Sequence, residues 1–173
     1  AWWLGAREVV GVDKDLCAIR QAQGELAHFR KTLKEMGWLL PPDASPETRS
    51  LIEPLRNRTV PRFVVADMAD STGLRSDHFD LCYCHRVLYL IRCDNSGTDE
   101  RARAAIQEMA RVTRPGGLVA ATEPTSCSAD GRSSVLLDDC FVQAGLLEFD
   151  NCENVFSARK RRTYLYAKPT RAT

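Results

Sequence analysis

No run of apolar residues in this sequence approaches the roughly 20 residues that a helix needs to cross a bilayer, so no membrane span is predicted. A basic segment followed by an apolar one is also missing at the N-terminus, and no secretory signal is predicted. Neither sign of charge is in excess, because 24 Lys and Arg residues stand against 23 Asp and Glu residues. This balance gives no long-range attraction to nucleic acid or to an acidic membrane surface.

Cysteine is present, but not in a pattern that indicates disulfides. The seven cysteines are an odd number without the compact spacing of a disulfide framework. Such usage favours a reducing compartment, and we expect a cytoplasmic protein. Cys82 and Cys84 stand two positions apart in an apolar run, with no second pair or histidine at ligand spacing. We therefore interpret them as small core residues and predict no metal site.

Strand and helix patterns alternate along the chain. Residues 8–13 form a short apolar run, and apolar residues then recur every three or four positions from Leu16 to Met36, with Asp15 as a suitable N-cap. Further strands are predicted at 62–67, 79–84, 118–122, 146–151 and 162–168, helices at 98–112 and 133–144, and a helical turn at 86–91. The alternation is typical of an α/β domain with a largely parallel sheet, and the length fits one domain over residues 1–173.

One stretch departs from this alternation. Residues 41–61 are rich in Pro, Ser, Glu and Arg, and we predict that they form an insertion at the domain surface. A second expected boundary is Pro115-Gly116-Gly117, which should end the helix at 98–112 before the next strand begins. Gly145 is expected just past the end of the helix at 133–144.

Four segments follow one another in a recognisable order: VVGVDKD, VVADM, FDLCYCHRVLYLI and MARVTRPGGLVAATEP. In this order the chain resembles the class I S-adenosylmethionine-dependent methyltransferases over nearly its whole length. The resemblance implies a Rossmann-like methyltransferase fold, with a mostly parallel seven-stranded sheet whose last strand is antiparallel. It also implies a first strand and a glycine-rich turn ahead of Ala1, so we expect a fragment that is incomplete at its N-terminus.

The resemblance implies S-adenosylmethionine as the cofactor, and open α/β sheets bind such ligands at the carboxyl ends of their strands. Asp13 would accept hydrogen bonds from the ribose hydroxyls, with Lys14 beside it. Asp67 would contact the adenine amino group, while Met68 would present its backbone N–H and side chain to the ring. The residues alone leave open that Asp13 only caps the following helix and that Asp67 is an ordinary turn residue.

The catalytic candidates follow the next two strands. Cys84, His85 and Arg86 would lie beneath the methionine part of the cofactor, where relatives often carry Asn and where His85 or Arg86 stands here. His85 is the first candidate for a general base and Glu123 the second, should the acceptor arrive protonated. A packing role remains open for His85 and also for Tyr89, which could border the acceptor pocket. Because no cysteine stands in a nucleophile motif, we expect direct methyl transfer without a covalent intermediate.

The sequence indicates a small-molecule acceptor. It lacks the Asn-Pro-Pro-Tyr signature of amino-directed nucleic-acid methylation and the Pro-Cys nucleophile of cytosine methylation. It names no partner protein and no oligomeric state. Two alternatives stay open: a noncatalytic methyltransferase-like subunit, and a dinucleotide-dependent oxidoreductase. The oxidoreductase shares the acid at its second strand but does not call for VVADM and RVTRPGG in these places.

Overall fold

The computed structural model describes residues 6–35, 45–47, 60–88, 90–91, 100–124, 133–154 and 161–170. The chain divides into two compact units, which we call unit 1 (Ala1–Asp67) and unit 2 (Met68–Thr173). Each unit has a sheet of its own. In the described ranges no helix combines the length and the apolar character needed to cross a bilayer.

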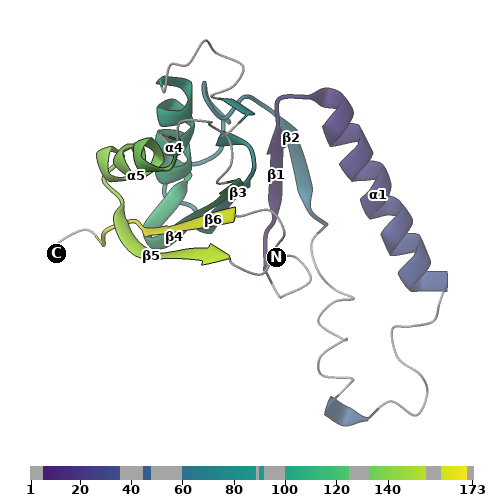
Figure 1. The fold of residues 1–173 in the computed structure, drawn as a ribbon. Coiled ribbons are helices and arrows are strands. Elements are labelled where there is room, and N and C mark those ends of the chain that lie inside the picture. The colour runs from purple at the N-terminus through teal and green to yellow at the C-terminus, as the bar shows by residue number, and fades with distance from the viewer. Residues whose placement is uncertain are drawn as a thin grey trace. The chain divides into compact units, whose positions relative to one another are not determined.

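Unit 1 is a helix packed along a pair of parallel strands (Figure 1). The elements are β1 (Val10–Asp13), α1 (Leu16–Glu35) and β2 (Arg62–Val65). Asp15 begins the helix as predicted, because its Oδ1 accepts a hydrogen bond from the Cys17 backbone N–H at 2.7 Å. Ile19 is the one buried apolar side chain among the described residues of this unit. Over residues 6–35, 45–47 and 60–67, the apolar core of unit 1 is therefore thin.

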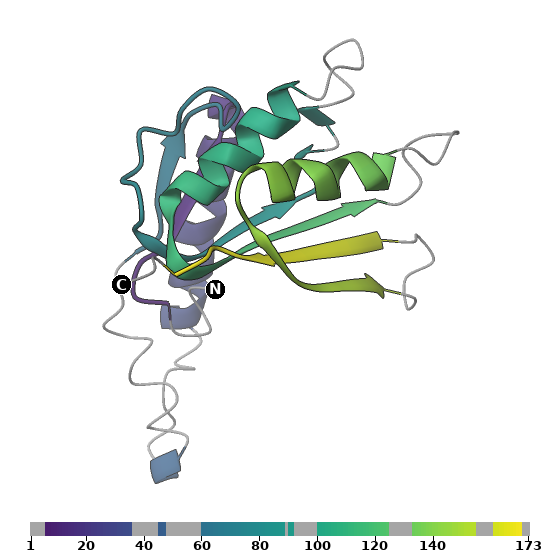
Figure 2. The same cartoon turned by 90° about the vertical axis from the view of Figure 1, so that its left-hand side faces the viewer.

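Unit 2 is a four-stranded sheet with the order β3-β4-β6-β5 and with two helices on one face (Figures 1 and 2). Its elements are β3 (Phe79–His85), α4 (Glu100–Val112), β4 (Thr113–Pro124), α5 (Ser133–Gln143), β5 (Leu147–Asn154) and β6 (Arg161–Ala167). β3 and β4 run parallel, whereas β6 is antiparallel to both β4 and β5. The expected antiparallel last strand is thus confirmed. Six strands of the implied seven fall within the described residues.

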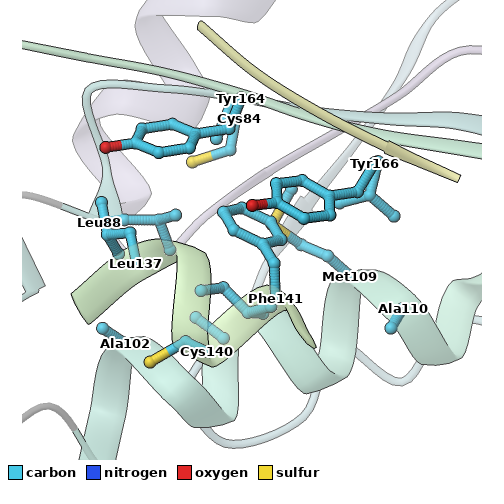
Figure 3. Packing of buried hydrophobic residues seen from close by; sticks show 14 of the residues in the cluster. Cys84, Leu88, Ala102, Met109, Ala110, Leu137, Cys140, Phe141, Tyr164 and Tyr166 are labelled. Carbon is cyan, nitrogen blue, oxygen red and sulfur yellow. The ribbon is translucent and has the colours of Figure 1, made fainter. Parts of the chain in front are cut away.

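The core of unit 2 lies between this sheet and the helices α4 and α5. Phe141 of α5 stacks on Tyr166 of β6 with ring centroids 4.5 Å apart, and on Tyr164 at 5.8 Å (Figure 3). Cys84 and Met109 belong to the same cluster of buried side chains. The alternation along β3 sends Cys82 and Cys84 toward the helices, which confirms their interpretation as core residues.

The junction of α4 and β4 differs from the predicted one. β4 begins at Thr113, directly after the helix, and continues through the proline and glycines that were expected to separate the two elements. Pairing with β3 passes from Thr113 to Leu118, so the residues between them bulge out of the ladder. A Cβ atom on Gly117 would lie only 2.9 Å from the carbonyl oxygens of Asp80 and Arg114. The glycine therefore permits a close backbone approach inside the strand rather than a break before it.

Other predicted features fall partly or wholly outside the described residues. Of the expected insertion at 41–61, the structure describes 45–47 and 60–61, and Pro46 and Glu47 are helical. Tyr89 also lies outside the described residues. Gly145 does follow α5 as expected, with φ of 75° and with its N–H donating to the Val142 carbonyl at 2.9 Å.

Candidate cofactor and acceptor site

Two acidic residues predicted to bind the cofactor come together in unit 1. The parallel strands β1 and β2 end side by side, since Asp13 is paired with Val65 and the Ala66 N–H donates to the Asp13 carbonyl at 3.0 Å. Asp67 follows directly, at the same edge of the strand pair. Asp13 and Lys14 are exposed, and Asp67 is half-buried. The carboxyl ends of the strands in unit 1 thus carry two carboxylates and a lysine.

The Asp13 carboxylate already accepts one hydrogen bond from the protein itself. Its Oδ1 accepts a hydrogen bond from the Asp15 backbone N–H at 2.8 Å, which shapes the turn into α1. This is the local role that the sequence left open. It does not exclude a ligand, because an ionised carboxylate has about four lone-pair sites and this contact uses one.

In unit 2, polar side chains gather where β3 and β4 end. His85 closes β3 opposite Thr122, and its Nδ1 lies 3.2 Å from the Tyr83 hydroxyl. That hydroxyl also donates toward Thr122 Oγ1 at 3.5 Å, and Thr122 is 3.2 Å from Thr163 Oγ1 of β6. The hydroxyls of Tyr83, Thr122 and Thr163 thus form a row that ends at Nδ1 of the histidine. His85 itself is exposed at the strand end.

The residue after His85 has an unusual backbone. Arg86 adopts φ of 58°, and its N–H donates to the Thr122 carbonyl at 2.9 Å. A left-handed conformation costs a side chain such as arginine about 1 kcal/mol or more, and such residues concentrate at functional sites. Sequence reasoning could not find this feature, because neither Gly nor Asn marks the position. The turn carries the chain sharply away from β3 directly beyond His85.

Glu123 has a structural partner. The side chain is 3% exposed, and its Oε1 accepts a hydrogen bond from the Leu88 backbone N–H at 3.2 Å. This contact satisfies an N–H group in the first turn of the short helical segment that follows β3. Its burial makes Glu123 a weaker base candidate than the exposed His85. A catalytic role for either residue stays a prediction.

The two thiols of β3 are unsuited to nucleophilic chemistry. Cys84 is 4% exposed and belongs to the same cluster of buried side chains as Tyr164 (Figure 3). Burial, reinforced by nearby carboxylates, raises the pKa of the Cys82 and Cys84 thiols to about 12. Both are therefore protonated at neutral pH and unreactive. Since its side chain points into the core, Cys84 could contact a cofactor only through its backbone.

Met68 opens unit 2 and is packed against its core. The side chain is half-buried against the cluster that contains Cys84 and Leu88, and the next residue, Ala69, is buried in the same cluster. Met68 is therefore anchored from within unit 2, whereas Asp13 and Asp67 belong to unit 1.

These features define an α/β domain of the Rossmann-like class with polar residues at the carboxyl ends of its parallel strands. Residues 4–121 match a family model described as a methyltransferase domain. The match spans well over half of the chain, which belongs to this family of class I S-adenosylmethionine-dependent methyltransferases. The family match sets aside the dinucleotide-dependent oxidoreductase. No curated protein matches the sequence significantly.

Solved structures show the same fold at low sequence identity. A methyltransferase from Methanosarcina mazei is 13% identical with a TM-score of 0.62, covering 98% of this chain and 85% of that one. A TehB-like methyltransferase from Corynebacterium glutamicum is 13% identical, with a TM-score of 0.58 and coverage of 93% and 68%. The N-methyltransferase NodS from Bradyrhizobium japonicum is 16% identical, with a TM-score of 0.51 and coverage of 73% and 71%. At such identities the likeness establishes the fold.

Proposed function

We propose that the protein binds S-adenosylmethionine and transfers its methyl group to a small-molecule acceptor. The observation that carries the proposal is the pair of carboxylates, Asp13 and Asp67, at the carboxyl edge of β1 and β2. Membership of the methyltransferase family supports the reaction, and the even charge balance supports a neutral or small acceptor over a polyanion.

The residues present fit the cofactor chemically. Carboxylates offer only acceptors, which suits ribose hydroxyls at Asp13 and an exocyclic amine at Asp67. Lys14 stands beside Asp13, and the backbone of Met68 would face the adenine ring. Bound to these residues, S-adenosylmethionine would supply an activated methyl group on a sulfonium. The protein's own task is then to orient the acceptor and exclude water, which can contribute about 7 to 11 kcal/mol of the barrier.

Direct transfer agrees with the state of the thiols of β3. Cys82 and Cys84 are protonated at neutral pH and buried, so neither offers a nucleophile. An acceptor that arrives protonated would need a base, and His85 has a suitable arrangement. When Nδ1–H donates to the Tyr83 oxygen, Nε2 is the basic nitrogen and can take a proton. The Tyr83 hydroxyl would then send its own hydrogen to Thr122.

The test is an Asp13→Asn variant measured by isothermal titration calorimetry with S-adenosylmethionine. Asparagine keeps an oxygen for the Asp15 N–H, so the turn into α1 is retained, but it loses the charged acceptor. We expect the Kd to rise roughly 10- to 100-fold, the usual worth of hydrogen bonds to a charged group.

The matched control is Asp80→Asn, because Asp80 is an exposed carboxylate near the start of β3, at the end away from His85. Its affinity should equal that of the wild type. Asp13→Asn binding as tightly as the control would remove Asp13 from the cofactor site. All three proteins are measured at full length, including any residues ahead of Ala1, and a wild-type protein of that length that does not bind the cofactor would instead favour the noncatalytic subunit.

The acceptor class is tested by transfer of a radiolabelled methyl group in a cell extract separated by size. Because NodS, which has the same fold, is an N-methyltransferase, small amines are the first acceptors to assay. We expect label in the small-molecule fraction. Label confined to precipitated nucleic acid or protein would contradict a small-molecule acceptor.

A further inference from the structure

A buried carboxylate in α4 receives four hydrogen bonds in unit 2. Glu108 is 8% exposed, and its Oε1 accepts from the Thr72 N–H at 2.9 Å and from the Thr72 hydroxyl at 2.5 Å. Arg111 donates from Nη2 to Oε1 at 2.7 Å and from Nε to Oε2 at 2.6 Å. The carboxylate of Glu108 is thus bound on one side by its own helix and on the other by a segment 36 residues earlier.

Arg111 extends this contact along the same segment. Its guanidinium donates to the Leu74 carbonyl at 2.8 Å and to the Ser76 hydroxyl at 2.7 Å. The Asp77 N–H then donates to the Arg111 carbonyl at 2.9 Å. Glu108 and Arg111 therefore hold the chain from Thr72 to Ser76, and we call these two residues the α4 clamp.

The clamped segment has no ladder of its own. Residues 68–78 contain neither a helix nor a strand, so their conformation depends on contacts with the core and with α4. At one end Ala69 is buried in the core of unit 2, and at the other the clamp binds Thr72 and Leu74. The Thr72 hydroxyl also accepts a hydrogen bond from the Leu74 N–H at 3.2 Å. Met68 begins this segment.

Burying the charged carboxylate of Glu108 costs free energy, because the group loses its hydration. A buried carboxylate must be paired and fully hydrogen-bonded to offset its lost hydration, and an apolar residue would often stabilise a helix face equally well. Electrostatic contacts of this kind hold one conformation better than apolar packing does, because they are directional. The arrangement therefore suits a loop that must be held in one shape.

We propose that Glu108 and Arg111 are positioning residues, which hold residues 72–76 and so fix the segment that begins at Met68 in the conformation that binds the adenine end of the cofactor. This inference rests on the proposed function, through the role of Met68. A segment ordered before the cofactor arrives need not be ordered by it, so the clamp raises affinity by removing that cost. Neither residue needs to touch the cofactor.

The test uses two variants of Thr72 that keep its volume or its hydroxyl. Thr72→Val is isosteric but removes the hydroxyl's bond to Glu108 and leaves the Leu74 N–H without its acceptor, while the Thr72 backbone N–H can still donate to Glu108. Thr72→Ser keeps both bonds. The control is Arg114→Gln, which breaks an exposed ion pair with Asp80. Its distance of 2.6 Å equals that between Arg111 Nε and Glu108 Oε2.

Two quantities are measured on the purified protein below its unfolding temperature: amide hydrogen exchange over residues 69–76 without ligand, and the Kd for S-adenosylmethionine. We expect Thr72→Val to exchange faster in this segment and to bind about three- to tenfold more weakly, a loss comparable to one hydrogen bond. Thr72→Ser and Arg114→Gln should match the wild type in both. Arg111→Lys keeps the charge but loses the fork that bonds to Leu74 and Ser76, and it is measured alongside Thr72→Val with the same expectations.

Each remaining outcome decides against part of the reasoning. Unchanged exchange in both Thr72→Val and Arg111→Lys would show that the clamp does not hold the segment. Faster exchange with unchanged Kd would make the clamp a stability feature and overturn its role in cofactor binding. A wild-type protein without affinity for S-adenosylmethionine would overturn the proposed function, and the role of the clamp with it. If the wild type binds the cofactor and Thr72→Val binds it equally well, only the role of the clamp is overturned.

Discussion

Neutralising Glu108 should change how the stability of unit 2 depends on pH. The hydrogen bonds from Arg111, with further bonds from Thr72, hold the pKa of the Glu108 carboxyl at about 2 against its ordinary 4.5, although burial opposes them. The folded pKa is the lower one, so the carboxylate stabilises the folded state above pH 4.5. That stabilisation is lost as the pH falls from about 4.5 toward 2.

The size of the effect follows from the shift. The difference 4.5 − 2 = 2.5 pKa units, at about 1.36 kcal/mol per unit, corresponds to about 3 kcal/mol. Glu108→Gln cannot titrate and should therefore lack this part of the acid sensitivity. At pH 7 the variant should be about 2 to 3 kcal/mol less stable than the wild type, and the two stabilities should converge toward pH 2.

The assay is urea unfolding between pH 2 and 7, followed by the near-ultraviolet circular dichroism of tyrosine. All four tyrosines lie in unit 2 and all three tryptophans in unit 1, so tyrosine reports on the unit that contains Glu108. Asp80→Asn, at an exposed carboxylate, is the control and should keep the wild-type pH dependence. Wild-type and Glu108→Gln curves that stay parallel across this range would refute the reasoning.

Two further predictions concern packing. Phe141→Ala should destabilise unit 2 by about 3 to 5 kcal/mol, because it removes the ring stacked on Tyr164 and Tyr166. Val142→Ala, at an exposed neighbour, should change the free energy of unfolding by less than about 0.5 kcal/mol. Comparable losses for the two variants in unfolding followed by tyrosine would contradict the core assignment. Gly117→Ala should lower the free energy of unfolding by about 1 to 3 kcal/mol, since a Cβ would lie 2.9 Å from two backbone oxygens. Gly24→Ala, with open space around it in α1, should raise it by about 0.5 to 1 kcal/mol. Both are measured by thermal unfolding followed by far-ultraviolet circular dichroism. A stabilising Gly117→Ala would show that the strand tolerates a side chain there.

Local patterns in the sequence predicted most of the elements. The repeat from Leu16 onward gave α1 its register, and Asp15 gave its start, because both signals depend on neighbours within one or two turns. The resemblance to methyltransferases, rather than periodicity, supplied the antiparallel last strand. The edge that carries Asp13 and Asp67 followed from the rule that parallel strands end together.

What the sequence missed depends on distant contacts. The start of β4 at Thr113 was hidden because a proline and two glycines usually end an element. Only the pairing of Thr113 with Phe79 shows that the strand begins before the bulge that contains them. The burial of Glu108 had no local sign either, since a charged residue in a helix ordinarily faces water. Its partner Thr72 is 36 residues away. The backbone of Arg86 is likewise fixed by Thr122 on the neighbouring strand.

The position of β6 has a consequence for the order in which the protein is made. β5 is synthesised before β6, yet in the described sheet β6 is its only partner and separates it from β4. Until β6 leaves the ribosome, β5 has no ladder to join, β4 keeps an open edge, and Phe141 lacks both of its tyrosines. Nascent chains that end short of Tyr164 would therefore present an unpaired strand edge and an uncovered aromatic ring. Unpaired edges and exposed apolar surface of this kind make incomplete chains prone to aggregation.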